Sequence, residues 1–154
     1  MTTVTEPAAA PAVSYGATVH IPVHFDDLDA MGMLHNSRYA VLVERAVSLW
    51  WAERGVSFSG GRPTTPDAFN VVREYGITFH RPVLGTGDIT IHFWLDKIGT
   101  TSAAYGFRVI STDATTVHAE GRRVNVRLNP ATMRPEPWTD HARGLAATIL
   151  RPTA

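Results

Sequence analysis

The sequence predicts an α+β domain in which a five-stranded antiparallel sheet wraps around one long helix. The first observation is a segment, about residues 37–54, in which apolar residues recur at helical spacing without Gly or Pro. The second is that one strand-like run precedes this segment and four follow it, with breaks too short for crossover connections. Because the helix is apolar over much of its circumference, the sheet is expected to curve around it.

The N-terminal half of the prediction consists of one strand and the helix. Alternate residues of 17–25 are apolar, so this run is expected to be a half-buried strand with Phe25 on its buried face. Pro22 has no N–H group to donate, which fits a sheet edge or a bulge. The helix is expected to end before Gly55, and its apolar positions at helical spacing are Tyr39, Leu42, Val43, Ala46, Val47 and Trp50.

The C-terminal half contains the other strands, expected at about 69–79, 88–97, 103–111 and 116–128. Residues 60–66, rich in Gly, Pro and Thr, are expected to form a loop, and a short helix is expected from Thr139. The chain length suits a single domain. We therefore expect a flexible N-terminal arm (1–15), the folded domain (16–133) and a C-terminal tail (134–154).

The composition excludes several classes of function. The 14 basic and 14 acidic residues give a net charge of +0, so no global field attracts nucleic acid or an anionic membrane. Without cysteine, the 154-residue chain has no thiolate nucleophile, Cys-ligated zinc or disulfide. No apolar run is long enough to cross a bilayer, and the first residues lack the pattern of a secretory signal. We expect a cytoplasmic protein that uses no metal or cofactor and binds neither nucleic acid nor membranes.

The residues that could carry chemistry concentrate between the first strand and the helix. Three carboxylates and two imidazoles lie within 24–36, namely His24, Asp26, Asp27, Asp29 and His35. Free N–H groups at a helix start can bind a developing oxyanion, and a nearby carboxylate can attack a carbonyl or deprotonate a water, as acyl transfer requires. On residue types alone, the carboxylates could equally form turns and complement the helix dipole. A metal site is not expected, because the spacing matches no zinc signature.

The same segment resembles a known family. The stretch Asp27-Leu28-Asp29-Ala30-Met31-Gly32, followed by His35-Asn36 and Tyr39, is similar to the 4-hydroxybenzoyl-CoA thioesterase-like branch of the hotdog superfamily. Residues 75–82 and 84–88 also look like this family, and the similarity spans about 18–130. The resemblance implies a hotdog fold that assembles as a homodimer or homotetramer, with active sites at the subunit interface. It further implies an acyl-thioester hydrolase that releases a carboxylic acid from an acyl-CoA or acyl-carrier-protein thioester.

The resemblance also implies roles for individual residues. Asp29 would be the catalytic carboxylate, and the backbone N–H of Asn36 would polarise the thioester carbonyl. Asp27 would support the loop by hydrogen bonding rather than act as a second catalyst, and Gly32 and Tyr39 would support the same loop.

Two other residues compete with Asp29. Glu44 follows Asn36 by eight residues, about two helical turns, and another hotdog branch places its catalytic acid at similar spacing. The alternative is a structural Glu44 that is hydrogen-bonded in the interface or paired with Arg45 or Arg38. His35 could activate water or contact the acyl chain, as in relatives that add an amine to an unsaturated thioester, or it could be an ordinary surface histidine.

Two further functions stay open at this point. The first is a hotdog enzyme that adds an amine or water to an enoyl thioester before or instead of hydrolysis, and the second is a non-catalytic acyl-binding module. Lys97 is the only charge near the hairpin where relatives meet CoA phosphates, although Arg122, Arg123 and Arg127 on the last strand could compensate or form a solvated face. A carrier-protein thioester is therefore nearly as well supported as a CoA thioester. An aromatic set could line an acyl tunnel or pack in the core: Trp50, Trp51, Phe58 and Phe69.

Overall fold

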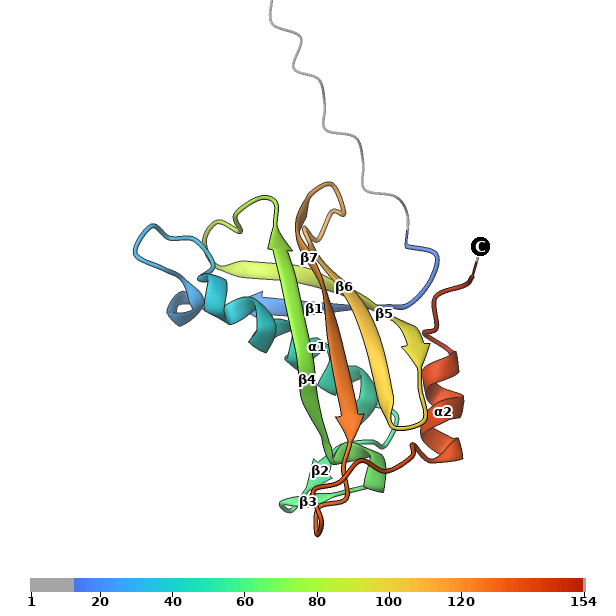
Figure 1. Cartoon of the computed structure of the whole chain (residues 1–154). Helices are drawn as coiled ribbons and strands as arrows, with labels where there is room; N and C mark the ends of the chain where they lie inside the picture. Colours follow the sequence, from blue (N-terminus) through green and yellow to red (C-terminus); the bar gives the residue numbers. More distant parts are fainter. Residues whose placement is uncertain (1–12, 154) are drawn as a thin grey trace, which may run out of the picture.

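The computed structural model describes residues 13–153 and confirms the predicted architecture: a five-stranded antiparallel sheet curves around the helix α1 (Figure 1). The strand order is β1-β5-β6-β7-β4. The sheet comprises β1 (Ala17–Val23), β4 (Asn70–Phe79), β5 (Gly87–Ile98), β6 (Ser102–Ile110) and β7 (Val117–Arg127). The remaining elements are α1 (Tyr39–Ala52), the hairpin β2 (Phe58–Ser59) and β3 (Arg62–Pro63), the 3-10 turns η1 (Phe25–Asp27), η2 (Asn36–Arg38) and η3 (Pro66–Ala68), and α2 (Asp140–Ala147). Most of the expected flexible arm lies outside the described residues.

The core forms between α1 and the concave face of the sheet. Leu42, Val43 and Ala46 of α1 are fully buried, and they belong to the same apolar cluster as Phe93 and Leu95 of β5. The stripe of apolar residues that predicted the helix is therefore the stripe that the sheet covers. The opposite flank of α1 stays exposed along Glu44, Arg45, Ser48 and Leu49.

Local hydrogen bonding shifts several boundaries of the predicted elements. Phe25 was expected on the buried face of the first strand, but β1 ends at Val23 and Phe25 is 85% exposed. The cause is the Asp27 carboxylate, which accepts the His24 N–H and turns the chain into η1. The α-helix begins at Tyr39 because residues 36–38 form a 3-10 turn, and the expected loop 60–66 contributes to the small β2–β3 hairpin. Pro22 lies on an edge strand, as predicted.

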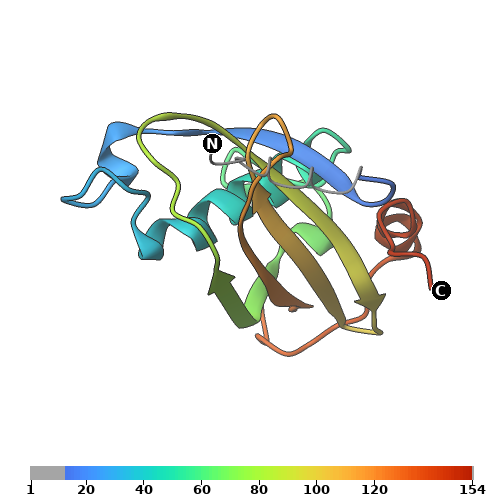
Figure 2. The same cartoon turned by 90° about the horizontal axis from the view of Figure 1, so that it is seen from above.

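The C-terminal segment closes the far end of the sheet. β1 pairs with β5 only as far as Phe93, and beyond that point the N–H and C=O of Leu95 bond to Ile149 and Arg151. The short helix expected from Thr139 is present as α2, and Ala146 and Ile149 pack into the main core. Figure 2 shows α2 beside the end of β5, at the opposite end of the molecule from the loop that precedes α1. None of the helices within 13–153 is long and apolar enough to cross a membrane.

Close packing at Gly121 generates a stability prediction. A Cβ at this position of β7 would overlap the Gly76 carbonyl oxygen and the Phe107 ring. We expect Gly121→Ala to lower the free energy of unfolding by about 1–3 kcal/mol, because the overlap can be relieved only by shifting strands. The matched control is Gly144→Ala at an exposed position of α2, where a Cβ meets nothing within 4 Å. That variant should gain about 0.5–1 kcal/mol from helix propensity. Denaturant unfolding measures both, and equal effects of the two substitutions would contradict the packing argument.

Candidate active site

The loop between β1 and α1 is a compact turn held by its own backbone. The Asp29 N–H donates to the Met33 carbonyl oxygen at 2.7 Å, and the Gly32 N–H donates to the Asp29 carbonyl oxygen at 3.0 Å. Gly32 adopts φ +77°, a left-handed conformation that residues with a Cβ rarely take, which explains the glycine at this position. The turn therefore fixes the direction in which the Asp29 side chain leaves the loop.

Asp29 uses only one of its two carboxylate oxygens within this turn. Its Oδ1 accepts the N–H groups of Met31 at 2.8 Å and Met33 at 3.1 Å. Its Oδ2 makes no hydrogen bond to any residue of the described chain, and the side chain is half-buried. One oxygen thus holds the carboxylate in position, while the other stays available to a bound molecule.

Asn36 provides a hydrogen-bond donor beside this carboxylate. It is the first residue of η2, and its backbone N–H donates to no residue within 13–153. Asp29, His35 and Asn36 line one open cavity of about 740 Å³, whose other wall is formed by Phe79, His80 and other residues at the end of β4. The residues that carry the free carboxylate oxygen and the free N–H therefore line the same cavity.

His35 has its Nδ1 engaged by the helix start. The Ser37 N–H donates to this nitrogen at 3.1 Å, which makes His35 the cap of η2. Because Nδ1 acts as an acceptor, the proton of the neutral imidazole is assigned to Nε2. In that form His35 offers the cavity a donor rather than a base.

Asp27 connects the loop to the start of the helix through hydrogen bonds. The carboxylate is buried and accepts the His24 N–H at 2.8 Å and the Arg38 Nε–H at 2.7 Å, and the Asp27 carbonyl oxygen accepts the His35 N–H. Burial acts to raise the pKa of Asp27, but these hydrogen bonds and the Arg38 charge outweigh it and leave the pKa below its ordinary value. Asp27 therefore remains an ionised structural group under the loop.

Tyr39 packs where the loop, α1 and β4 meet. It is buried, and its ring lies edge-on to that of Phe79 with centroids 4.9 Å apart. Burial raises the pKa of Tyr39, opposed in part by a hydrogen bond from the Val83 backbone. Tyr39 thus anchors the first turn of α1 against the edge strand.

Of the possible metal ligands, His24, Asp26 and Asp27 have ligand atoms within 4.8 Å of one another. Both Asp27 oxygens already accept hydrogen bonds, one of them from a cation. An ion bound here would therefore have to compete with the hydrogen bonds of Asp27. The cluster includes neither Asp29 nor His35.

The structure places Glu44 away from Asp29. The expected partners of Glu44 were Arg45 or Arg38, but its Oε1 instead accepts Arg123 Nη2 at 3.1 Å, and Arg38 pairs with Asp27. Curvature of the sheet brings β7 under the middle of α1, a contact between residues 79 positions apart that local spacing cannot indicate. Glu44 lines a second cavity, which does not include Asp29.

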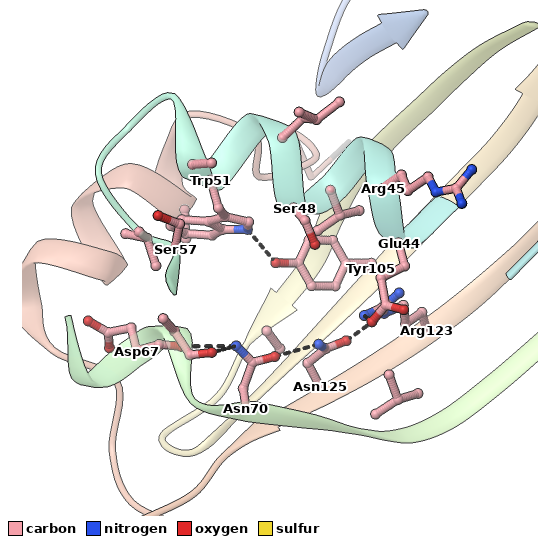
Figure 3. A pocket seen from close by; sticks show the side chains of 18 of the residues that line it. Glu44, Arg45, Ser48, Trp51, Ser57, Asp67, Asn70, Tyr105, Arg123 and Asn125 are labelled. Atoms are coloured by element: carbon pink, nitrogen blue, oxygen red, sulfur yellow. Dashed lines mark hydrogen bonds and ion pairs between the residues drawn. The ribbon is translucent and has the colours of Figure 1, made fainter. Parts of the chain in front are cut away.

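This second cavity, of about 940 Å³, is larger than the cavity at Asp29 and lies between the exposed flank of α1 and the sheet (Figure 3). Of the aromatic set, Trp51 and Phe58 line it, whereas Trp50 packs in the core. Tyr105 was not among the residues expected at the site, and Arg123 was expected to meet a phosphate or to lie on a solvated face, yet both contribute to the cavity wall. One available signal was that Arg122 and Arg123 are adjacent on a strand, so that one of them must face the helix. Arg127 pairs with Glu136 and is not free to bind a phosphate.

Comparisons with known proteins identify the family and the fold. The family model of the Thioesterase superfamily matches residues 31–118, and the chain belongs to that family. The match includes Asn36, Tyr39 and Glu44 but begins after Asp29. The fold is therefore that of a hotdog thioesterase, as the sequence predicted. No curated protein matches the chain.

Solved structures share the fold at low sequence identity. The PA5185 protein of Pseudomonas aeruginosa has a TM-score of 0.81 and 21% identity, covering 91% of this chain and 95% of its own. A predicted thioesterase of Bacillus stearothermophilus has a TM-score of 0.72 and 20% identity, and the match covers 90% of this chain and 100% of that protein. A Thermus thermophilus thioesterase complexed with coenzyme A and Zn has a TM-score of 0.71 and 22% identity, and the match covers 90% of this chain and 98% of that protein.

The buried Asp27 carboxylate gives a pH-dependent prediction. Its pKa is lower in the folded protein than the ordinary 3.8, so its stabilising effect is complete above that value and is lost as pH falls through the folded pKa. At pH 7 we expect Asp27→Asn to lower the free energy of unfolding by about 1–3 kcal/mol. The difference from wild type should shrink at acidic pH below 3.8. Unfolding curves across pH measure it, with exposed Asp26→Asn as control. A difference that does not change with pH would contradict the assignment.

Proposed function

We propose that the protein hydrolyses an acyl thioester, with Asp29 as the catalytic carboxylate and the Asn36 N–H as the donor to the thioester carbonyl. The observation that carries this proposal is the pairing of two unused groups in one cavity. Asp29 Oδ2 and the Asn36 N–H make no hydrogen bonds within 13–153, and both residues line the cavity at the helix start. A carboxylate and an oxyanion donor are the two components that acyl transfer needs.

Asp29 could hydrolyse the thioester by either of two routes. Asp29 Oδ2 can attack the carbonyl carbon and expel the thiolate, which leaves an acyl-aspartyl anhydride for water to hydrolyse. Alternatively, Oδ2 removes a proton from water while the water oxygen attacks, and the proton passes to the departing sulfur. In both routes the Asn36 N–H, at the positive end of η2 and α1, stabilises the oxyanion. The products are a carboxylic acid and a free thiol.

The substrate we propose is an acyl-CoA or an acyl-carrier-protein thioester. Both carry a phosphorylated pantetheine arm, and His80 and Arg81 line the proposed site. The Arg81 guanidinium makes no hydrogen bond or ion pair with a residue of 13–153, so it is available to a phosphate. The structure of the Thermus thermophilus thioesterase with coenzyme A supports the CoA alternative. Because both substrates are cytoplasmic, we propose that the protein acts in the cytoplasm.

We further propose that the protein works as a homodimer or homotetramer joined through β4. This edge strand is exposed along almost its whole length and presents Val71, Val72, Tyr75 and Phe79 to solvent. An exposed apolar edge invites pairing with another strand. Two-fold pairing of β4 with its copy would continue the sheet and set the two α1 helices antiparallel. The loop of one chain, with Asn36, would then face α1 of the other.

The catalytic role is tested by Asp29→Asn. The amide keeps the shape and can retain the loop geometry but has neither a nucleophilic oxygen nor useful basicity. We expect the hydrolysis rate to fall by about 10²-fold or more, as for loss of a positioned base. A residual rate above that in water should remain, because the Asn36 donor is intact. Thiol release from acyl-CoA and acyl-carrier-protein substrates measures the rate, and circular dichroism confirms the fold.

Two companion variants make this experiment decisive. If Glu44→Gln abolishes hydrolysis while Asp29→Asn stays near wild type, the catalytic acid is on α1. If neither matters but His35→Ala does, the enzyme follows the histidine-driven reaction in which an amine or water adds to an enoyl thioester. The Ser37 N–H donates to His35 Nδ1, which leaves this nitrogen unavailable as a base and favours the carboxylate over the histidine. A chain inactive on every thioester that still binds acyl groups would be an acyl-binding module.

The assembly is tested by light scattering at micromolar concentration. We expect a mass at least twice the 16.8 kDa of the chain. Val72→Lys places a charge on β4 and should lower the measured mass, because charged edge positions oppose strand pairing. Val13→Lys is the control, since Val13 is 40% exposed against 45% for Val72 but lies outside the sheet edge. A wild-type monomer that hydrolyses thioesters would overturn the proposal.

A further inference from the structure

The larger cavity has apolar walls and a polar floor. Val47, Leu49 and Trp51 of α1 contribute to the walls, together with Val71 and Val72 of β4. Its volume of about 940 Å³ is at the upper end for small-molecule sites. The floor is built by Tyr105 of β6 and by Arg123 and Asn125 of β7, whose side chains point toward α1 (Figure 3). Burying a guanidinium and a phenol under an apolar cavity is costly unless their donors find partners.

A chain of hydrogen bonds fixes the position of Arg123. The Asn70 Nδ2 donates to the Asp67 carbonyl oxygen at 2.9 Å, so its Oδ1 is the atom that accepts Asn125 Nδ2 at 2.7 Å. The Asn125 Oδ1 in turn accepts Arg123 Nε at 2.9 Å. At the far end Arg123 Nη2 reaches Glu44. Each amide is oriented by the next, so the guanidinium is held in place before any molecule binds.

Two donors on this floor remain unused. The Tyr105 hydroxyl accepts Trp51 Nε1 at 2.8 Å but donates its own hydrogen to no residue within 13–153. Burial, opposed in part by Trp51 and Arg123, raises the pKa of Tyr105 to about 12, so that hydrogen is retained at neutral pH. Arg123 Nη1 likewise has no hydrogen-bond partner among the described residues.

We propose that this cavity binds the acyl chain of the substrate and selects chains that carry a neutral oxygen, such as a hydroxyl or keto group, away from the thioester. The inference rests on the proposed function and specifies its substrate class. The oxygen would accept from the Tyr105 hydroxyl, while the methylene groups pack against Trp51 and the valines. A plain hydrocarbon chain would cover this donor without satisfying it.

The ion pair with Glu44 sets the charge that the cavity accepts. Arg123 is 7% exposed and is already neutralised by Glu44, which is 57% exposed at the cavity mouth. A terminal carboxylate would add a second negative charge to this pair and would have to displace Glu44 or remain desolvated. A neutral oxygen needs neither change, so it is preferred over both an unsubstituted chain and a dicarboxylic one.

The test compares three acyl groups of equal length: unsubstituted, ω-hydroxy and α,ω-dicarboxylic. Lengths of about six to twelve carbons suit a cavity of this size. For CoA thioesters we expect kcat/KM at the best length to be about tenfold or more higher for the ω-hydroxy chain, since unmatched buried donors penalise the alternatives. Tyr105→Phe should reduce this ratio about three- to tenfold, the effect of one hydrogen bond. Because the ratio is taken within one variant, a loss of folded protein cancels. Tyr15→Phe, on the opposite face of the sheet, should leave it unchanged.

A binding measurement separates this inference from the proposed function. Calorimetry with the free ω-hydroxy and unsubstituted acids should show the same preference and the same dependence on Tyr105. If that preference is present but no thioester is hydrolysed, the cavity assignment stands and the hydrolase proposal fails. If thioesters are hydrolysed with ratios near one at every length, or if Tyr105→Phe leaves the ratio intact, the inference is overturned.

Discussion

Burial of one face of α1 against a curved sheet is the constraint on which the rest of the molecule depends. Five strands cover Leu42, Val43 and Ala46 completely, but they leave the flank with Glu44 and Ser48 exposed. The larger cavity opens along that uncovered flank, and the cavity at Asp29 opens at the start of the same helix. Both candidate sites therefore exist because a five-stranded sheet cannot enclose a helix of this length by itself.

Residues just before α1 have two different roles: one carboxylate stabilises the loop, and another is available to a bound molecule. Asp27 and Asp29 are two residues apart, yet one is buried beneath Arg38 while the other keeps an oxygen free toward a cavity. This division follows from hydrogen bonding: Asp27 holds the chain on both sides of the loop, and Asp29 uses one oxygen to close its turn. The burial of Asp27 thus fixes the backbone from which Asp29 and Asn36 face the same space.

The two cavities differ in the chemistry of their linings, and each suits a different part of the proposed substrate. The smaller one combines a carboxylate, a free N–H and basic groups, which suit a thioester and a phosphorylated arm. The larger one is apolar except for a held guanidinium and a phenol, which suit a chain with a single polar substituent. In one chain the cavities do not merge, because Glu44 and Arg45 lie beside one and Asp29 beside the other. An antiparallel pair of α1 helices is the arrangement that would bring the loop of one copy to the cavity of the next.

Local patterning determined the elements of this protein. The helix is visible from the spacing of Tyr39 to Trp50, the strands from alternation and short breaks, and the edge position of β1 from Pro22, because each signal acts within one element. The loop with Asp27, Asp29 and Gly32 is also local, so its residues could be selected from the sequence. Only the tertiary structure decided that Phe25 turns outward, that Glu44 pairs with Arg123, and that Tyr105 and Arg123 face a cavity. These contacts join residues far apart in sequence through the curvature of the sheet, and no local pattern encodes that curvature.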